Sequence, residues 1–287
     1  MKNYLSLIKF SHTIFAMPFA LLGFFTALQT SDKSFSFTLL LLVILCMIFA
    51  RSAAMAFNRW ADSDIDKLNP RTAVREIPAG VIDSNRALFF VILNAVLFII
   101  TTYFINTLCF YLSPVALFIV LSYSYTKRYT FLCHLILGLG LALAPIGAYL
   151  SVNPVFNWIP VLYGFVVLFW VSGFDIIYAL QDEHVDKDLN LYSIPSFFGS
   201  RKALFISMSL HLISAAILIY TVFKYQEANV HIGLFHIAGI VFFILLLIYQ
   251  HTLVKVDDLS KVNLAFFTTN GISSMVFCLL VILDFYI

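Results

Sequence analysis

Two long stretches without charge constrain this chain more than any other feature of its sequence. No Asp, Glu, Lys or Arg occurs from Ala87 to Thr126 or from Tyr129 to Phe174. Each stretch is about twice the ~20 residues that a helix needs to cross a bilayer. Of the 287 residues, 62% are hydrophobic and 11% are charged, whereas soluble domains are roughly 45–50% apolar and about 25% charged. The sequence therefore predicts a polytopic membrane protein and excludes a soluble one.

The apolar segments predict an all-α bundle of about nine transmembrane helices, forming a single integral-membrane domain over residues 1–287. The continuous apolar runs disfavour a membrane β-barrel, whose strands alternate apolar and polar residues. We expect a tight turn at Asn106-Thr107 between the third and fourth spans, and another turn at Ser151–Pro154 between the fifth and sixth. The expected spans cover residues 10–28, 37–57, 87–107, 108–126, 131–150, 156–180, 203–223, 231–253 and 263–285.

The basic residues are distributed unevenly between the loops. Of 17 Lys and Arg residues, 14 lie in the amino-terminal segment or in loops after even-numbered spans, and only Lys33 and Lys224 lie in opposite loops. Because cytoplasmic loops carry the excess of Lys and Arg, we expect a plasma-membrane protein with its amino terminus in the cytoplasm and its carboxyl terminus outside. A net charge of +2 without a basic stripe gives no support for nucleic-acid binding.

Carboxylates cluster at the cytoplasmic end of the second span. Asn58, Asp62 and Asp66 are spaced four residues apart, so on a continuing helix they would share one face. Arg51 lies seven residues before Asn58, two turns away on the same face. Carboxylates at this spacing repel by a few tenths of a kcal/mol, and a divalent cation between them would relieve the repulsion. Oxygen ligands of this kind suit Mg²⁺.

A second cluster with the same spacing ends the sixth span, 120 residues after the first. Asp175, Tyr178, Asp182 and Asp186 again fall on one helix face, and the duplication hints at an internal repeat. The alternative is two solvated helix ends that carry acids by chance. A charge inside the bilayer costs about 2.5–3.5 kcal/mol unless it faces a polar cavity. A structural bridge between Arg51 and Asp175 is the alternative explanation for these two buried charges.

Basic residues that suit phosphate oxygens accompany both clusters. The same residues also satisfy the positive-inside rule, and for Arg86, Arg201, Lys202, Lys255 and Lys261 we prefer that interpretation. His184 lies between the second-cluster aspartates and stays ambiguous. The other histidines, His134, His211 and His251 among them, show no metal-like spacing and no evident partner. The candidate phosphate-binding residues are Lys67, Arg71, Arg75, Lys127 and Arg128.

Three segments resemble one known family. NRWADSDIDKLNPRTAVREIPAG (residues 58–80) and DIIYALQDEHVD (residues 175–186) are similar to the two aspartate-rich motifs, NxxxDxxxD and DxxYAxxDxxxD, of the UbiA-type intramembrane prenyltransferases. YSYTKRYT (residues 123–130) resembles the basic segment that follows the fourth span of that family. The resemblance covers nearly the whole chain, with both motifs at the family's separation.

The resemblance implies a Mg²⁺-dependent enzyme that transfers a polyprenyl group from its diphosphate to a small aromatic acid, in respiratory quinone biosynthesis. By motif position, Arg71, Lys127 and Arg128 would neutralise the diphosphate, with Lys67 and Arg75 beside them. Tyr178 would lie near the leaving oxygen and Asp175 near the allylic carbon. Arg51 would bind the acceptor carboxylate. The residues implied to hold Mg²⁺ and the diphosphate are Asn58, Asp62, Asp66, Asp182 and Asp186.

The acceptor implied first is 4-hydroxybenzoate or a similar ring. Asp188, Asn190 and Tyr192 stand where hydroxybenzoate-specific members more usually carry Lys, Gly and Lys. This departure resembles a side branch often labelled 4-hydroxybenzoate polyprenyltransferase, whose members are also proposed to prenylate a carboxylated dihydroxynaphthalene in the futalosine route to menaquinone. Both acceptors carry a carboxylate, so Arg51 does not separate them. A membrane transporter, from a different class, would also bury charges near helix ends, but it would not need two aspartate faces and arginines at one surface.

Overall fold

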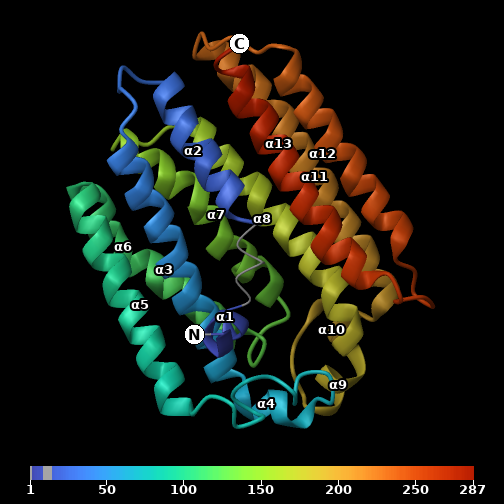
Figure 1. Ribbon diagram of the computed structural model, residues 1–287. Helices are drawn as coiled ribbons and strands as arrows, with labels where there is room; N and C mark the ends of the chain where they lie inside the picture. Colours follow the sequence, from blue (N-terminus) through green and yellow to red (C-terminus); the bar gives the residue numbers. More distant parts are fainter. Residues whose placement is uncertain (1, 9–14) are drawn as a thin grey trace.

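The computed structural model describes residues 2–8 and 15–287, and within these ranges the chain is entirely helical apart from its loops (Figure 1). The helices are α1 (Lys2–Leu7), α2 (Met17–Gln29), α3 (Phe37–Ala61), α4 (Ser63–Leu68), α5 (Ser84–Ile105), α6 (Thr107–Thr126), α7 (Cys133–Val152), α8 (Trp158–Ala179), α9 (Glu183–Asp188), α10 (Ile194–Phe198), α11 (Ser200–Glu227), α12 (Leu234–Leu253) and α13 (Asn270–Asp284). A 3₁₀ turn (Leu180–Asp182) joins α8 to α9, and a π-helical segment (Leu264–Thr269) precedes α13.

The predicted all-helical membrane bundle is confirmed. In the described part of the chain, eight helical segments are long and apolar enough to cross a membrane, and the ninth apolar helix, α2, has 13 residues. Residues 10–14, where the first span was expected to begin, lie outside the described residues. The expected bounds of the other spans agree with the helices to within a few residues, and Asn106 forms the expected tight turn between α5 and α6.

Polar side chains set where several spans begin. Ser36 accepts a hydrogen bond from the backbone of Leu39 at the start of α3, and Asp83 does the same for Asn85 and Arg86 at the start of α5. Such caps satisfy backbone N–H groups that have no partner within the helix. Asn106 and Asn157 cap α6 and α8 in the same way.

Helix α8 lies at the centre of the bundle and packs against α7 and α11 (Figure 1). Its fully buried Trp170 donates its indole N–H to Asn270 at the start of α13, at 2.9 Å. Glycine permits the closest helix contact in this layer, because a Cβ at Gly138 of α7 would lie 2.4 Å from the carbonyl oxygen of Leu168. The central span is therefore fixed by hydrogen bonds and by close backbone packing together.

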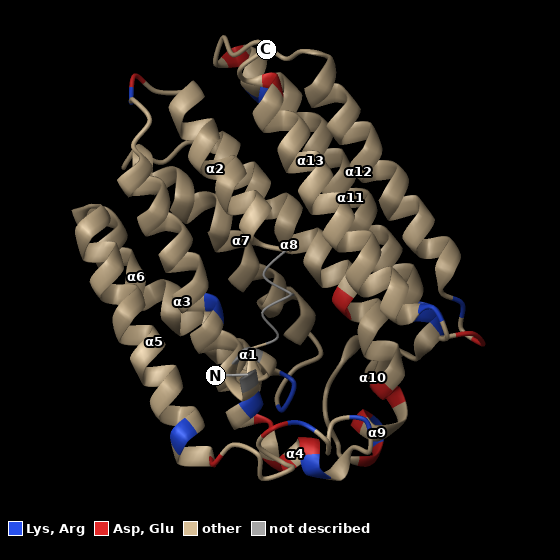
Figure 2. Cartoon of the chain, in the orientation of Figure 1, with Lys and Arg blue, Asp and Glu red and all other residues tan. Residues whose placement is uncertain are grey.

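The charged residues gather mainly at one end of the bundle. Figure 2 shows most of the Lys, Arg, Asp and Glu residues around α4 and α9, while the helices between the two ends carry few charged residues. Helix α1 is tied to this end by a hydrogen bond from the Ser6 hydroxyl to the Glu76 carboxylate. The elements that carry both aspartate clusters therefore meet on one side of the molecule.

Candidate active site

A cavity of about 1070 Å³ runs from the charged end into the bundle. Its mouth is lined by both aspartate clusters and by basic side chains, and its interior by apolar residues of α3, α6, α7 and α8. Helix α7 presents small residues to this cavity at Gly140, Ala144, Gly147 and Ala148. A polar mouth above an apolar interior suits a ligand with a charged head and a long hydrocarbon tail.

The first aspartate cluster spans a break between two helices, so the predicted continuous helix is wrong here. Helix α3 ends at Ala61 and α4 begins at Ser63, with Asp62 between them. The guanidinium of Arg128 donates to the carbonyl oxygen of Ala61 at 2.6 Å. The carbonyl oxygen of the last α3 residue thus accepts a hydrogen bond from a side chain of another span. Ser and Asp residues also favour such breaks, because their side chains compete for backbone hydrogen bonds.

The helical spacing of the first cluster nevertheless survives the break. The backbone N–H of Asp62 donates to the oxygen of Asn58 at 2.9 Å, and that of Asp66 to the oxygen of Asp62 at 2.8 Å. Asn58 also donates its side-chain amide to the Asp62 carboxylate at 3.1 Å. All three residues line the cavity.

The second cluster is interrupted in the same way. Helix α8 ends at Ala179, a 3₁₀ turn carries Asp182, and α9 carries Asp186. The prediction of a single helix across this cluster is therefore also wrong. Asp175, Tyr178, Asp182 and Asp186 still line the cavity together.

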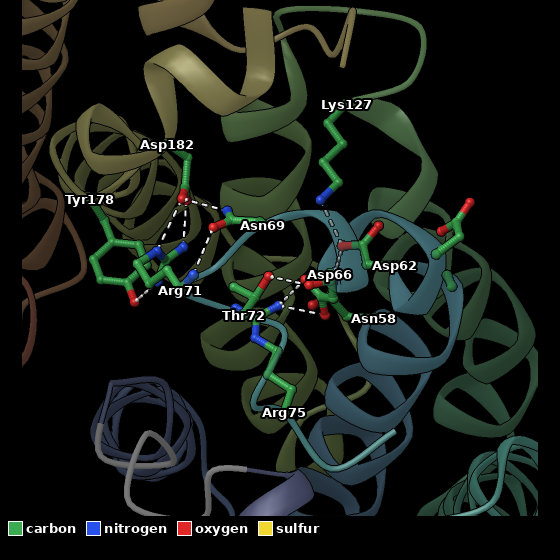
Figure 3. Close-up of polar contacts among 12 residues, drawn as sticks. Asn58, Asp62, Asp66, Asn69, Arg71, Thr72, Arg75, Lys127, Tyr178 and Asp182 are labelled. Carbon is green, nitrogen blue, oxygen red and sulfur yellow. Dashed lines mark hydrogen bonds and ion pairs between the residues drawn. The ribbon is translucent and has the colours of Figure 1, made fainter. Parts of the chain in front are cut away.

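Three of the cavity aspartates form ion pairs with three of the predicted phosphate-binding residues (Figure 3). Arg75 contacts both oxygens of Asp66, at 2.7 and 2.8 Å. Lys127 lies 2.9 Å from Asp62, at the end of α6. These pairs neutralise carboxylates that are almost fully buried, since the Asp62 and Asp66 side chains are each only 4% exposed.

The segment after α4 joins the two clusters (Figure 3). Arg71 binds Asp182 through two nitrogens, at 3.0 and 2.5 Å, and donates to the Tyr178 hydroxyl at 2.9 Å. The side-chain amide of Asn69 donates to the same Asp182 carboxylate at 3.0 Å, and its side-chain oxygen Oδ1 accepts from the backbone N–H of Arg71. Asn69 was not among the residues predicted from the sequence. The only sequence signal for Asn69 is its position before Pro70, because a residue before proline is held in an extended conformation and ends the helix.

Two predicted basic residues lie away from the cavity. Lys67 is exposed on α4 and is not among the lining residues. Arg128 instead binds the exposed Asp64 at 2.8 Å and also contacts the end of α3. The hydrogen bonds from Arg128 lower the pKa of the Asp64 carboxyl below its usual range.

Asp175 lies in the cavity wall and has a histidine partner. Its Oδ2 atom is 2.7 Å from Nδ1 of His134, a residue with 3% side-chain exposure. In the described structure Asp175 forms no ion pair with Arg51, so the alternative explanation of a structural bridge between these two residues is not supported. The expectation that the histidines have no partner is wrong for His134, and also for His211 and His251, whose rings are joined at 2.8 Å.

Two buried guanidinium groups in the cavity wall have unused donors. Within the described chain, Nε of Arg51 and both Nε and Nη1 of Arg59 are buried without a hydrogen-bond partner. Arg59 was missed by the sequence analysis, where it counted only as a loop charge. Because a buried donor without a partner costs about 1–3 kcal/mol or more, these groups favour an anionic ligand.

The Asp62 carboxylate also has an unused atom. Its Oδ1 is buried and accepts no hydrogen bond in the described structure. Burial raises the pKa of the Asp62 carboxyl, and the charge and hydrogen bond of Lys127 oppose that shift. A cation next to Oδ1 would favour the ionised form in the same manner.

The donor set of the cavity fits Mg²⁺ held partly by a ligand. No group of three or more His, Cys, Asp or Glu side chains in the described residues forms a ready metal cluster. Mg²⁺ does not require one, because it is commonly bound by one or two carboxylates plus substrate phosphates and water. The unpartnered Oδ1 of Asp62 and the amide of Asn58 are oxygen donors of the right kind.

The chain belongs to the UbiA prenyltransferase family, whose model matches residues 16–272. A 4-hydroxybenzoate octaprenyltransferase of Vesicomyosocius okutanii is 30% identical over 244 residues, covering 83% of this chain and 85% of the relative. A protein of the same name from Legionella pneumophila (strain Paris) is 30% identical over 231 residues, covering 78% and 79%.

Solved structures share the fold. The apo structure of a UbiA homolog from Aeropyrum pernix K1 matches with a TM-score of 0.83 and 29% identity, over 95% of this chain and 98% of that one. A UbiA homolog from Archaeoglobus fulgidus, solved bound to DMAPP and Mg²⁺, matches with a TM-score of 0.77 and 21% identity, over 99% of each chain. The bundle is thus the fold of a prenyltransferase family.

Proposed function

We propose that this protein transfers a polyprenyl group from polyprenyl diphosphate to 4-hydroxybenzoate, in respiratory quinone biosynthesis and with Mg²⁺ as cofactor. Residues 1–287 would form one domain that lies in the plasma membrane, with the cavity mouth at the cytoplasmic face. The observation that carries this proposal is the cavity itself, whose charged mouth joins both aspartate clusters above an apolar interior. The curated relatives named as 4-hydroxybenzoate octaprenyltransferases support the choice of acceptor.

The mouth of the cavity is where the diphosphate would bind. When bound there, Mg²⁺ would supply a Lewis acid that stabilises the charge developing on the departing diphosphate. Arg71, Arg75 and Lys127 would turn from their aspartates to the phosphate oxygens, for which guanidinium and ammonium groups are suited. For Lys67 and Arg128, which lie away from the cavity, we propose a contribution to the local field only. The residues proposed to hold the metal are Asn58, Asp62, Asp66, Asp182 and Asp186.

The reacting centre would lie just inside the mouth. The Tyr178 hydroxyl accepts a hydrogen bond from Arg71 and would lie beside the leaving oxygen of the diphosphate. Arg51 has a buried, unused donor and would bind the acceptor carboxylate. The apolar walls would exclude water, which would otherwise quench the allylic cation. Asp175 and nearby aromatic rings such as Phe174 and Phe266 would stabilise that cation through charge and cation–π attraction.

The test is an assay of isolated membranes that contain the protein, with octaprenyl diphosphate and labelled 4-hydroxybenzoate. We expect a prenylated product and released diphosphate, both lost on chelation with EDTA and restored by added Mg²⁺. A parallel reaction with a carboxylated dihydroxynaphthalene measures the competing acceptor. Prenylation of the naphthalene alone would overturn the proposed acceptor, and activity unaffected by EDTA would overturn the proposed cofactor. Release of no diphosphate with either acceptor would overturn the enzyme itself.

A further inference from the structure

Asp175 differs from three other cavity aspartates in the partner that it binds. Asp62, Asp66 and Asp182 are each paired with a Lys or Arg side chain. In the described residues, Asp175 has no Lys or Arg within ion-pair distance and is bound by His134 instead. A neutral imidazole donor stabilises a carboxylate in the membrane interior without cancelling its charge. Asp175 is therefore held by an imidazole, whereas these three aspartates are held by ammonium or guanidinium groups.

The hydrogen bonds of His134 fix which of its nitrogens carries the proton. The backbone N–H of Ile194 points at Nε2 of His134 at 3.3 Å. A backbone N–H can only donate, so Nε2 accepts and the proton of the neutral ring lies on Nδ1. The Nδ1–H group then donates to Oδ2 of Asp175 at 2.7 Å. This arrangement leaves Oδ1 of Asp175 without a hydrogen-bond partner in the described structure.

The surrounding elements hold His134 in place from two sides. The hydroxyl of Ser172 on α8 donates to the His134 carbonyl oxygen at 3.0 Å, next to the close glycine contact between α7 and α8. On the other side, Ser193 caps α10 and also donates to Asp186 at 2.8 Å, so the loop that supplies the Ile194 amide is tied to the second aspartate cluster. The orientation of the imidazole is thus fixed before any ligand binds.

We propose that His134 is a positioning residue that holds Asp175 as an aimed, ionised carboxylate, and that Oδ1 of Asp175 accepts the proton released by the acceptor ring. The inference deepens the proposed function and rests on it. His134 and Asp175 both line the cavity, and Tyr123 lies within electrostatic range of both Arg51 and Asp175. Asp175 therefore borders the same cavity as Arg51, which would hold the acceptor.

The step balances as follows. The C–O bond of the polyprenyl diphosphate breaks and its electron pair leaves on the diphosphate. A π pair of the ring, from the carbon next to the hydroxyl, forms the new C–C bond to the allylic carbon. The hydrogen on that ring carbon then passes as a proton to Oδ1 of Asp175, and the C–H pair restores aromaticity. The Asp175 acid returns its proton to the released diphosphate or to water as the products leave.

The test compares 4-hydroxybenzoate with the same acid deuterated at both carbons next to the hydroxyl, in the wild-type protein and its variants. His134→Ala removes the donor, and we expect kcat to fall about 10²-fold, as for a small misplacement of a reacting group. Since proton removal then limits the rate, the deuterium isotope effect on kcat should rise above that of the wild type, while KM for the prenyl diphosphate stays the same. His134→Gln retains an N–H donor and should restore much of the rate.

Two further variants keep the test decisive. Asp175→Asn retains an oxygen that can accept from His134 but loses the base, so it should lose more activity than a folded His134→Ala variant, and it tests the base directly if His134→Ala fails to fold. His236→Gln changes a buried histidine of α12 outside the cavity, and should leave both kcat and the isotope effect unchanged.

Wild-type turnover of 4-hydroxybenzoate combined with an unchanged isotope effect in His134→Ala would overturn the inference while leaving the proposed function standing. Near wild-type activity in Asp175→Asn would do the same. If the wild-type protein prenylates no hydroxybenzoate, the proposed function fails first, and this step fails with it.

Discussion

At the scale of single residues, the cavity mouth is a set of charges that already have partners. Lys127, Arg75 and Arg71 are each paired with one aspartate of the cavity. Truncating one member of a buried pair leaves an uncompensated charge and costs several kcal/mol. Substitutions at this mouth must therefore be isosteric if activity is to be separated from folding.

Asp62→Asn tests the first cluster. The amide keeps the shape of the side chain but removes the charge that would hold Mg²⁺, so we expect kcat to fall by at least about 10²-fold, as when one group that stabilises transition-state charge is lost. Asp64→Asn is the matched control, because Asp64 is 64% exposed and pairs with Arg128 away from the cavity. Turnover and membrane yield are measured for both. Equal activity in the two variants would remove Asp62 from the metal site.

Arg51→Ala tests the acceptor pocket. Loss of the buried guanidinium should raise KM for 4-hydroxybenzoate at least about tenfold, since a hydrogen bond to a charged group contributes about 1.5–3 kcal/mol. KM for the prenyl diphosphate should change little. Arg51→Lys keeps the charge but not the planar fork, so its KM for 4-hydroxybenzoate should lie between those of the wild type and Arg51→Ala. A similar rise in both KM values in Arg51→Ala would place this arginine at the diphosphate instead.

The residues that the sequence revealed are those with a local pattern. The four-residue spacing predicted that the aspartates of each cluster share a face, and Asp62, Asp66 and Asp182 all line the cavity. Asn69 and His134 were missed because their partners lie 113 and 41 residues away, and no local pattern records such contacts. Arg128 shares its segment with Lys127, yet only the packing of α3 against α6 decides which of the two reaches the cavity.

At the scale of elements, α2 and α7 pack closely at a glycine. A Cβ at Gly23 would lie 2.2 Å from the carbonyl oxygen of Pro145, which is backbone and cannot move aside. We therefore expect Gly23→Val to lower the free energy of unfolding by about 1–3 kcal/mol or more, as overpacking does. The measurement is thermal unfolding of the purified protein in detergent.

Gly147, which lies on α7 with Pro145, is a glycine without such a contact. A Cβ there would have no heavy atom within 4 Å. Gly147→Ala should leave unfolding unchanged or raise its free energy by up to about 1 kcal/mol, because alanine favours a helix interior. Equal unfolding temperatures for Gly23→Val and the wild type would show that α2 and α7 separate more easily than their packing indicates.

Helix existence was easier to predict from the sequence than helix continuity. Hydropathy and capping residues located the spans because each is a property of one segment. The breaks at Asp62 and Leu180 were missed because helical spacing persists through them, and because one cause, the bond from Arg128 to Ala61, comes from another span. A periodic pattern specifies which residues share a face but does not show where the backbone is interrupted.

At the scale of the whole molecule, the separation of charge predicts how the bundle lies in the membrane. We expect the end that carries α4 and α9 to face the cytoplasm, because positive residues concentrate there (Figure 2). The check is single-cysteine labelling of intact cells with a membrane-impermeant maleimide. A cysteine at exposed Lys33 should be labelled, whereas one at exposed Asp64 should react only after lysis. The reverse result would invert the orientation.

The paired charges at the cavity mouth also have a consequence for how ligands bind. A metal that takes an aspartate frees a lysine or arginine, and a diphosphate that takes the lysine or arginine frees an aspartate. Each ligand alone would leave buried charge without compensation, whereas both together exchange the partners at nearly constant charge. Their affinities are then thermodynamically linked, and linkage is reciprocal. We therefore expect Mg²⁺ to tighten diphosphate binding by the same factor by which diphosphate tightens Mg²⁺ binding.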